Sequence, residues 1–347
     1  MLSMTEPLLV TGASGYLGRN IVREFLARGH KVRGLTRSDA SSDLIRQLGA
    51  EPVRGDIMDR TSLEAAMNGA VALVHAAADT DHGRPTRVQE LTNLQGTQNV
   101  YDAARTAGVK RAVHISTEAV LVDGRPIVNA DETWPIPEKL AGGYSRTKAG
   151  AERVALAANG NGMDVIVMRP RFVWGRDDTT ALPQLVAAVK SGKLVWFDGG
   201  DYLTSTTHIA NVVEGVRLCL EKGRGGQVYF VTDAEDIAFR PWVTALLATQ
   251  CIGVSGVKSV PRGLMNFIVN AGELLANLTG GSLSGPLGRQ EYATVGNTVT
   301  LNIAKARQEL GYAPVMSRAA GLSELEAWGT SAGGEEIMQR IDASRAP

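Results

Sequence analysis

The sequence is poor in cysteine and has no net charge. Only two cysteines occur among 347 residues, Cys219 and Cys251, and their separation fits neither a disulfide framework nor a metal site. We therefore expect two buried thiols in a reducing compartment. Basic and acidic residues number 36 each, so the formal net charge is zero and no long basic run is present. This balance argues against a nucleic-acid partner.

Long apolar runs are missing as well. No stretch reaches the roughly 18 to 20 apolar residues of a spanning helix, and the first residues lack the pattern of a signal peptide. We expect a cytoplasmic protein without a transmembrane segment.

The five histidines are scattered, so we expect no metal site; they are His30, His75, His82, His114 and His208. We interpret His75 and His114 as satisfied structural residues near strand ends.

Apolar segments alternate with helix-like segments through the first half of the chain. Short apolar strands are expected at 7–10, 31–35, 71–77, 112–116, 164–170 and 227–231. Amphipathic helices are expected at 16–28, 61–69, 86–107, 144–158 and 206–223. Thr61 and Glu64 have the spacing of a capping box. This alternation predicts an α/β fold, a doubly wound parallel Rossmann sheet covered on both faces.

The pattern loosens after Gly175, which indicates a second region. We expect 1–175 to form the Rossmann domain, with 204–234 returning to it. Segments 176–203 and 235–330 then form a smaller, mostly helical region, and 331–347 a tail. A helix at 261–280 carries apolar residues at 264, 267, 268, 271, 274, 275 and 278, and polar ones at 266, 270, 273 and 277. It either packs on its own domain or loosely contacts a membrane or lipid substrate.

The glycine-rich segment TGASGYLG (11–18) lies between the first strand and the first helix. Gly12 permits a tight turn, Gly15 lets the backbone approach a pyrophosphate, and Gly18 permits close packing of helix on sheet. The unpaired N–H groups at the start of the helix, at Tyr16 and Leu17, face the anion. The segment predicts a dinucleotide site.

The end of the second strand bears on the choice of cofactor. An acidic residue there would bind the ribose 2′-hydroxyl of NAD, but this chain has Thr36 followed by Arg37. A guanidinium suits a 2′-phosphate, so NADP(H) is favoured. NAD(H) remains acceptable if Arg37 only stacks on the adenine.

Two further strand ends fit the same ligand. Asp56, followed by Ile57, could accept a hydrogen bond from the adenine amino group. Ala76, Ala77 and Ala78 provide the small side chains that a strand mouth beneath a cofactor needs.

Six ordered motifs resemble those of extended short-chain dehydrogenase/reductases. They are TGASGYLG, HAAAD, NLQGTQN, HISTEAV, YSRTK and RPRFVWG. YSRTKAGAE, THIANVVEG and KARQELGYAP are most similar to the branch of 3β-hydroxysteroid dehydrogenases and sterol-4α-carboxylate 3-dehydrogenases. The resemblance implies hydride transfer between a nicotinamide cofactor and a secondary alcohol or ketone, with a bulky apolar substrate such as a 3β-hydroxysteroid. It also implies a homodimer through the helices at 86–107 and 144–158.

The resemblance assigns the acid/base chemistry to YSRTK. Tyr144 is expected to exchange the proton of the substrate oxygen, and Lys148, one turn later on the same helix face, to favour the phenolate and bind the nicotinamide ribose. Thr117 corresponds to the hydroxyl that holds the substrate oxygen. Ser116 is the alternative for that role, although a structural role suits it better.

The same resemblance assigns supporting roles. Asn93 supports hydrogen bonds on the cofactor side, unless it is a helix-surface or capping residue. Pro170 lies beside the nicotinamide. Phe172 and Trp174 could wall the substrate pocket, unless they belong to the core.

Two other functions remain open. The first is a nucleotide-sugar dehydratase or epimerase, since a dehydratase would need an acid beside the tyrosine and Glu118 follows Thr117. Such an enzyme would also need cations to bind a diphosphate, and residues 236–300 hold few of them: Arg240, Lys258, Arg262 and Arg289. A non-catalytic NADP(H) sensor would not need the Tyr144 and Lys148 pair.

Overall fold

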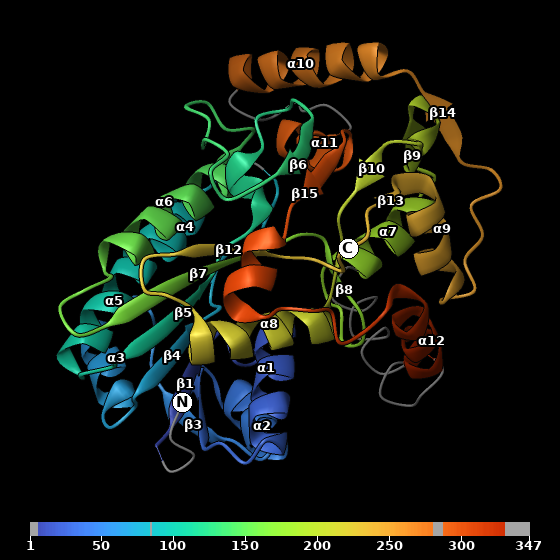
Figure 1. Cartoon of the computed structure of the whole chain (residues 1–347). Helices are drawn as coiled ribbons and strands as arrows, with labels where there is room; N and C mark the ends of the chain where they lie inside the picture. The colour runs from blue at the N-terminus through green and yellow to red at the C-terminus, as the bar shows by residue number, and fades with distance from the viewer. Residues whose placement is uncertain (1–5, 84, 280–286, 330–347) are drawn as a thin grey trace.

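A seven-stranded parallel sheet forms the centre of the molecule (Figure 1). The computed structural model describes residues 6–83, 85–279 and 287–329. In spatial order the strands are β12 (Val228–Val231), β7 (Asp164–Pro170), β5 (Arg111–Ile115), β4 (Ala72–His75), β1 (Leu8–Thr11), β2 (Val32–Thr36) and β3 (Glu51–Arg54). The order reverses between β1 and β4, which places a crevice at their carboxyl ends. This is the predicted Rossmann sheet, and β12 joins it beside β7.

Helices cover both faces of this sheet. One face carries α1 (Tyr16–Ala27), α2 (Asp39–Gln47) and α8 (Ile209–Lys222). The other carries α3 (Arg60–Met67), α4 (Arg87–Glu90), η1 (Leu91–Gln95), α5 (Gly96–Thr106) and α6 (Gly143–Ala157). The strands are apolar on both sides because each side packs on helices, as the continuous apolar runs predict.

A second, smaller layer lies above the carboxyl ends of the strands. A four-stranded sheet contains β13 (Ile237–Ala238), β10 (Leu203–Thr204), β15 (Val299–Leu301) and β6 (Ile127–Ala130). Two small pairs join β8 (Val173–Trp174) to β11 (Thr207–His208), and β9 (Val195–Phe197) to β14 (Lys258–Val260). The helical elements of this side are α7 (Ala181–Lys190), α9 (Phe239–Ala248), α10 (Arg262–Leu278), α11 (Arg289–Val295) and α12 (Arg318–Gly329), with the short turns η2 (Glu118–Leu121), η3 (Asp198–Gly200) and η4 (Ala306–Leu310).

Four local expectations need correction. Helix α3 is capped by Asp59, whose carboxylate accepts from the N–H groups of Thr61 and Ser62, so the expected capping box from Thr61 to Glu64 is wrong. The helix expected at 86–107 contains a π-helical turn, η1. Residues 207–208 are a short strand, and the helix expected from 206 begins at Ile209. Cys219 is buried as expected, but Cys251 is exposed because it lies in the turn after α9 with φ of 56°.

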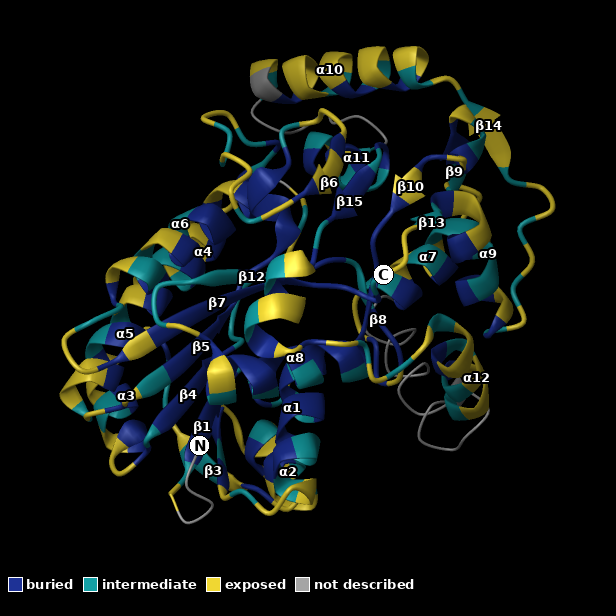
Figure 2. Cartoon of the chain, viewed as in Figure 1, coloured by how far each residue is buried: buried dark blue, intermediate teal, exposed yellow. Residues whose placement is uncertain are grey.

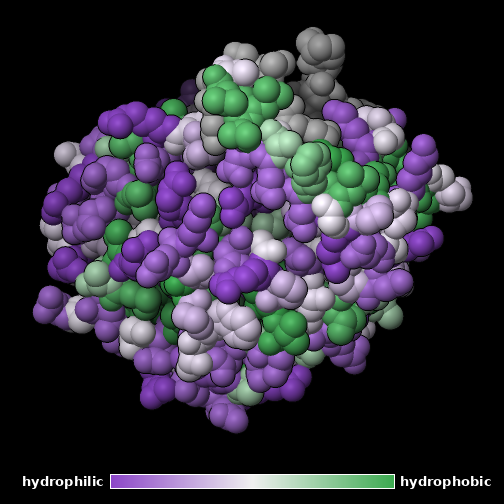
Figure 3. All heavy atoms as spheres, turned by 90° about the horizontal axis from the view of Figure 1, so that it is seen from above, coloured by the Kyte–Doolittle hydropathy of each residue, from purple (hydrophilic) through white to green (hydrophobic). Residues whose placement is uncertain are grey.

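Helix α10 lies across the top of the second layer (Figure 1). Met265, Val269 and Ala276 are buried beneath it. The stripe that the sequence marks as apolar points mostly away from the protein; its exposed members are Leu264, Phe267, Leu274, Leu275 and Leu278. Figure 2 shows this outer side of α10 as exposed, and Figure 3 shows hydrophobic residues gathered on the same face of the molecule.

Within the described ranges, no helix combines the length and the apolarity that crossing a membrane requires. The predicted tail, 331–347, lies outside the described residues.

Candidate active site

The glycine segment forms a tight cradle between β1 and α1. A Cβ on Gly12, which has φ of 66°, would lie 2.8 Å from the N atom of Ala77, and one on Gly18 would lie 2.0 Å from the Gly12 carbonyl oxygen. At Gly15 a Cβ would meet only the Gly12 carbonyl oxygen, at 3.2 Å, so its outer side is open. Gly15 caps α1 without a side-chain bond, and the first turn has no acidic residue. The cradle therefore fits the pyrophosphate of a dinucleotide.

The mouth of β4 is fixed against this cradle. The N–H of Ala77 donates to Thr11 Oγ1 at 3.3 Å. Asn93, which is buried in η1, accepts from the N–H of Asp79 at 2.8 Å and donates to the Asp79 carbonyl at 2.9 Å. It also donates to Thr147 Oγ1 at 3.0 Å, so one side chain joins the strand mouth to α6. This burial argues against the helix-surface interpretation of Asn93.

The adenosine side has a different character. Arg37 is exposed, and across the described residues its guanidinium makes no hydrogen bond or ion pair. Asp56 uses Oδ1 to accept from the N–H of Met58 at 2.9 Å, and Asn99 donates to the Ile57 carbonyl at 2.9 Å. The contacts of Asp56 and Asn99 hold the loop after β3 in place. Neither contact involves Arg37, whose guanidinium is available to a ligand.

Thr117, Tyr144 and Lys148 come together above the carboxyl end of β5. Lys148 Nζ donates to the Ile115 carbonyl at 2.7 Å. Burial raises the pKa of Tyr144, the negative charge of Glu118 raises it further, and a hydrogen bond with Thr117 opposes them. Burial lowers the pKa of Lys148 to about 8, while Glu152 opposes that shift. At neutral pH the site thus holds a neutral phenol and a mostly protonated amine.

Ser116 has a structural partner. Its hydroxyl donates to Glu152 Oε2 at 2.6 Å, and Arg169 donates to the same carboxylate from Nε at 2.9 Å and Nη2 at 2.5 Å. Ser116, Arg169 and Glu152 are all buried. This arrangement favours a structural role for Ser116 and leaves Thr117 as the hydroxyl that is bonded to the Tyr144 phenol.

The residues after β7 divide between site and core. Pro170 is buried at the strand end and pairs with Val231 of β12. Trp174 is fully buried and donates from Nε1 to Asp233 Oδ2 at 2.9 Å, which fits the core interpretation. Phe172 is only partly buried, has φ of 41°, and meets Trp242 edge-on with ring centroids 6.3 Å apart. Of the two aromatic residues, only Phe172 is partly exposed.

Sequence reasoning missed two residues beside Tyr144. The His82 ring lies 4.4 Å from the Tyr144 ring, centroid to centroid. Gln290 of α11 accepts from the N–H of Ser145 at 3.1 Å, in the first turn of α6. No sequence pattern marks either residue, because both approach Tyr144 from irregular or distant segments.

The buried histidines behave differently from each other. His75 is bonded on both ring nitrogens, to Thr11 Oγ1 at 2.7 Å and Thr97 Oγ1 at 3.1 Å. His114 has no hydrogen-bond partner for either ring nitrogen among the described residues, so the expectation that it is satisfied is wrong. Burial lowers the pKa of both, that of His75 to about 3.

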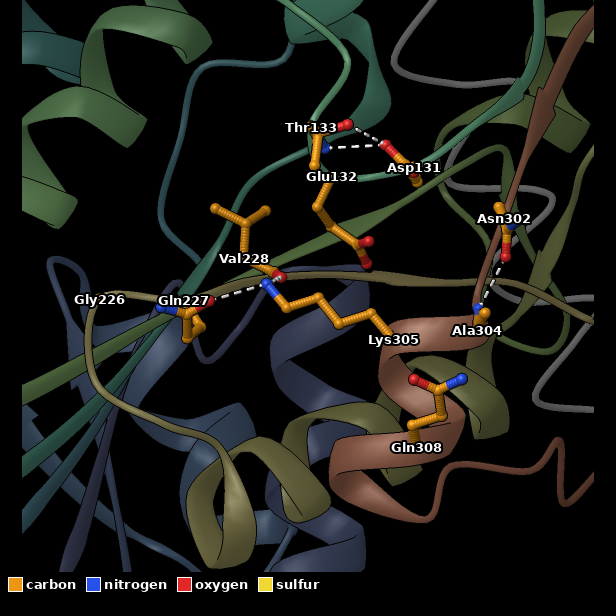
Figure 4. A pocket seen from close by; sticks show the side chains of 10 residues that line it. All are labelled: Asp131, Glu132, Thr133, Gly226, Gln227, Val228, Asn302, Ala304, Lys305 and Gln308. Carbon is orange, nitrogen blue, oxygen red and sulfur yellow. Dashed lines mark hydrogen bonds between the residues drawn. The ribbon is translucent and has the colours of Figure 1, made fainter.

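A hollow of about 480 Å³ lies elsewhere, at the sheet edge formed by β12 (Figure 4). Lys305 Nζ donates to the Val228 carbonyl at 2.9 Å, and Glu132 accepts from the N–H of Phe230 at 2.8 Å. These side chains pair the backbone groups of an edge strand. The hollow is therefore part of the fold's edge protection and not of the candidate active site.

Comparisons with known proteins agree with this geometry. Residues 9–252 match the 3-beta hydroxysteroid dehydrogenase/isomerase family. A 4-hydroxy-2-methyl-3-oxo-4-farnesyl-3,4-dihydroquinoline-1-oxide ketoreductase from Stigmatella aurantiaca is 44% identical over 325 residues, 94% of this chain and 97% of that protein. A decarboxylating sterol-4-alpha-carboxylate 3-dehydrogenase from Dictyostelium discoideum is 32% identical, with 92% and 99% covered.

A solved dTDP-glucose 4,6-dehydratase from Streptomyces venezuelae, with NAD and TYD bound, is similar in structure. Its TM-score is 0.74 at 26% identity, with 95% of this chain and 99% of that chain covered. The family match, the relatives and the Rossmann site lead to one assignment. The chain belongs to the 3-beta hydroxysteroid dehydrogenase/isomerase family and is an extended short-chain dehydrogenase/reductase that acts on CH–OH groups.

Proposed function

We propose that the protein is an NADP(H)-dependent ketoreductase for a bulky apolar substrate, with Tyr144, Lys148 and Thr117 as its acid/base system. The observation that carries this proposal is that Tyr144 is hydrogen-bonded to Thr117, while Lys148, one turn along α6, is bonded to the Ile115 carbonyl at the end of β5. The bound dihydronicotinamide supplies the hydride.

The side chains then account for the proton. Because burial and Glu118 keep Tyr144 protonated at neutral pH, its hydroxyl can donate to a substrate ketone oxygen as the alcohol forms. The Lys148 ammonium, one helical turn away, stabilises the phenolate left behind. The raised pKa of Tyr144 means that its hydroxyl is present as a proton donor at neutral pH, as reduction of a ketone requires.

Arg37 supports the preference for NADP(H). Its exposed guanidinium is free of protein carboxylates among the described residues, and it directly follows β2, where the adenosine ribose lies in this fold. A 2′-phosphate would give it a charge-assisted, bidentate partner.

An apolar substrate is supported by the upper layer. Phe172 contacts Phe239 and Trp242, in a core rich in aromatic residues. Two of the four cations that a sugar diphosphate could use are paired with carboxylates: Arg262 lies 3.4 Å from Asp198 Oδ2, and Arg289 lies 3.5 Å from Glu273 Oε2. Glu118 is ion-paired as well, which weighs against a dehydratase acid.

The exposed stripe of α10 supports loose contact with a lipid surface. Helix α10 packs on α11, and α11 packs on the helix that carries Tyr144. An apolar substrate leaving a lipid surface at α10 would enter close to the site. The polar residues Asn266, Asn270 and Glu273 lie on a separate side, as in interfacial helices.

A homodimer is part of the same proposal. Val88 of α4 and Leu91 of η1 are exposed beside the helices through which the relatives' branch is expected to pair. Light scattering that gives the mass of one chain would remove this part of the proposal.

The function is tested by fluorescence titration with NADPH and NADH, followed by turnover of a panel of steroid, quinolone and simple ketones. A Tyr144→Phe variant is the control. Tight NADPH binding by both proteins, with turnover lost only in the variant, is the expected result. Binding without turnover of any ketone would favour a sensor.

A further inference from the structure

Arg171 and Glu118 form a buried ion pair beside the candidate acid/base. Arg171 Nη1 lies 2.5 Å from Glu118 Oε1, and the two side chains are 1% and 5% exposed. The second carboxylate oxygen, Oε2, accepts a 2.7 Å hydrogen bond from the Thr117 hydroxyl. A buried pair of this kind holds its geometry only if its remaining donors are also satisfied.

The remaining donors of Arg171 reach the upper layer. Its Nε donates to Thr204 Oγ1 of β10 at 3.1 Å, and its Nη2 donates to the Thr294 carbonyl of α11 at 3.0 Å. One guanidinium therefore connects the loop that carries Thr117 with two elements of the substrate side.

Glu118 decides the direction of the Thr117 hydroxyl. A threonine hydroxyl can donate only one hydrogen bond, and here it donates that bond to Glu118. The bond to Glu118 therefore fixes the orientation of the Thr117 side chain, which is also hydrogen-bonded to the Tyr144 phenol. Without a carboxylate at Glu118 the hydroxyl would be free to rotate.

Helix α11 contacts both the helix that carries Tyr144 and the Arg171 side chain. Gln290 accepts from the N–H of Ser145, next to Tyr144, and donates to Thr294 Oγ1 at 3.2 Å. The same helix thus contacts the acid/base helix through Gln290 and Arg171 through Thr294.

We propose that Arg171 and Glu118 are positioning residues that fix the Thr117 side chain beside Tyr144 and connect this part of the site to α11. Neither residue needs to touch the reacting atoms. The proposal rests on the proposed function, because it concerns the acid/base system named there.

The pKa of Tyr144 depends on the charges of Glu118 and Arg171, so it is a quantity that a purely structural role of these residues would not change. Glu118 raises the pKa of Tyr144, and Arg171 balances that charge. The other groups around Tyr144 are the His82 ring and Lys148, one turn along α6; Glu118, Glu291 and Asp81 act on His82. All these residues are kept in the variants below. Because Glu118→Gln also removes a charge that acts on His82, the effect is followed on the Tyr144 resonance itself.

The experiment measures Tyr144 directly and through turnover. The Tyr144 phenol is titrated by NMR of 13Cζ-labelled tyrosine in protein saturated with NADP⁺, with the resonance assigned by Tyr144→Phe. The kcat and KM for NADP⁺-dependent oxidation of a 3β-hydroxysteroid are measured against pH. The proteins are wild type, Glu118→Gln, Arg171→Met, Arg171→Lys and the double variant Glu118→Gln/Arg171→Met, with Ser116→Ala as the matched control.

The expected shifts have opposite signs. Glu118→Gln lowers the Tyr144 midpoint and the acid limb of kcat by about one pH unit, and Arg171→Met raises both. Arg171→Lys keeps the midpoint near wild type but lowers kcat about tenfold, because an amine cannot reach Glu118 and Thr294 together. Ser116→Ala moves neither the midpoint nor the limb.

Unmoved midpoints in Glu118→Gln and in the double variant would overturn the proposal, even if Arg171→Met failed to fold. An equal loss of kcat at every pH in all variants would show a structural role only and would overturn it too. Failure of the wild type to oxidise or reduce any tested substrate would instead count against the proposed function, and the NMR titration would still decide the positioning role.

Discussion

Ser116 and Thr117 are neighbours in the chain, yet their hydroxyls donate to two different buried carboxylates, Glu152 and Glu118. Each carboxylate is in turn bonded by an arginine at the end of β7, Arg169 or Arg171. The first arrangement joins β5 to α6 within the Rossmann layer. The second joins the site to the upper layer, and only this one includes Thr117. These different partners support a structural role for Ser116 and a role in the candidate site for Thr117.

Replacing Tyr144 by phenylalanine should abolish turnover without affecting cofactor binding. Removal of the general acid is expected to lower kcat by about a hundredfold to ten-thousandfold. NADPH affinity should stay within about twofold, because the cradle at Gly12 to Gly18 is untouched. Stopped-flow fluorescence of NADPH measures both quantities. Turnover close to wild type would remove Tyr144 from the mechanism.

Thr117 should tolerate serine but not valine. Thr117→Ser keeps the hydroxyl that donates to Glu118, so kcat should fall less than about threefold. Thr117→Val has nearly the same shape but leaves Glu118 Oε2 without its donor, and we expect a loss of about tenfold or more. Steady-state kinetics of the two variants make the comparison. Equal activity of both would contradict a role for the hydroxyl.

Arg37→Ala should weaken NADPH binding selectively. Losing a charge-assisted contact to a 2′-phosphate should raise the Kd for NADPH by about 10- to 100-fold and leave the Kd for NADH nearly unchanged. Calorimetric titration with each cofactor gives both constants. If the two constants rise together, Arg37 stacks on the adenine and the NADP(H) preference has another origin.

The exposed stripe of α10 predicts binding to lipid vesicles. A triple variant, Leu264→Ser/Phe267→Ser/Leu274→Ser, should lose flotation with phosphatidylcholine vesicles, because these side chains would otherwise bury in the interface. The matched control changes the polar side, Asn266→Ser/Asn270→Ser, and should float like wild type. A wild-type protein that does not float would refute the lipid contact.

Acid should destabilise the fold through the buried histidines. Because the pKa values of His75 and His114 are lowered in the folded state, the unfolded chain takes up protons first as the pH falls below about 6.5. For His75 the loss is expected to be about 1.4 kcal/mol per pH unit, down to a pH of about 3. Stability is fully present above about pH 6.5.

His114→Phe isolates this effect. It removes two ring nitrogens that have no hydrogen-bond partner among the residues the structure describes, and it keeps an aromatic ring beside His75 and Tyr101. The thermal midpoint of the variant should fall less than that of wild type between pH 7 and pH 5. Parallel curves for the two proteins would show that His114 does not titrate on unfolding.

Local patterns were sufficient to predict the Rossmann layer. Its strands and helices alternate, the glycines lie at the first turn, and Tyr144 and Lys148 share a helix face, all of which depend on short-range spacing. The N-cap of α3 was misplaced because Asp59 and Thr61 are both good caps, and only the path of the chain selects between them.

The missing parts depend on contacts between distant segments. Arg171 lies in the RPRFVWG motif, but its partner Glu118 is 53 residues away, and Gln290 reaches α6 from far along the chain. The outward stripe of α10 could not be predicted, because the helix also carries a second apolar side with Met265 and Val269. Periodicity shows that a side is apolar and leaves open which side is covered.

Strand β6, which lies in the segment 127–130, pairs with β15 from 299–301. The cofactor half and the substrate half therefore cannot be separated by a single cut in the polypeptide. A fragment that ends before β15 would retain β6 with its main neighbour missing, and a fragment that begins after β6 would have the converse defect. The two layers should consequently melt in one cooperative transition, and a swap of substrate regions between relatives must exchange two stretches of sequence together.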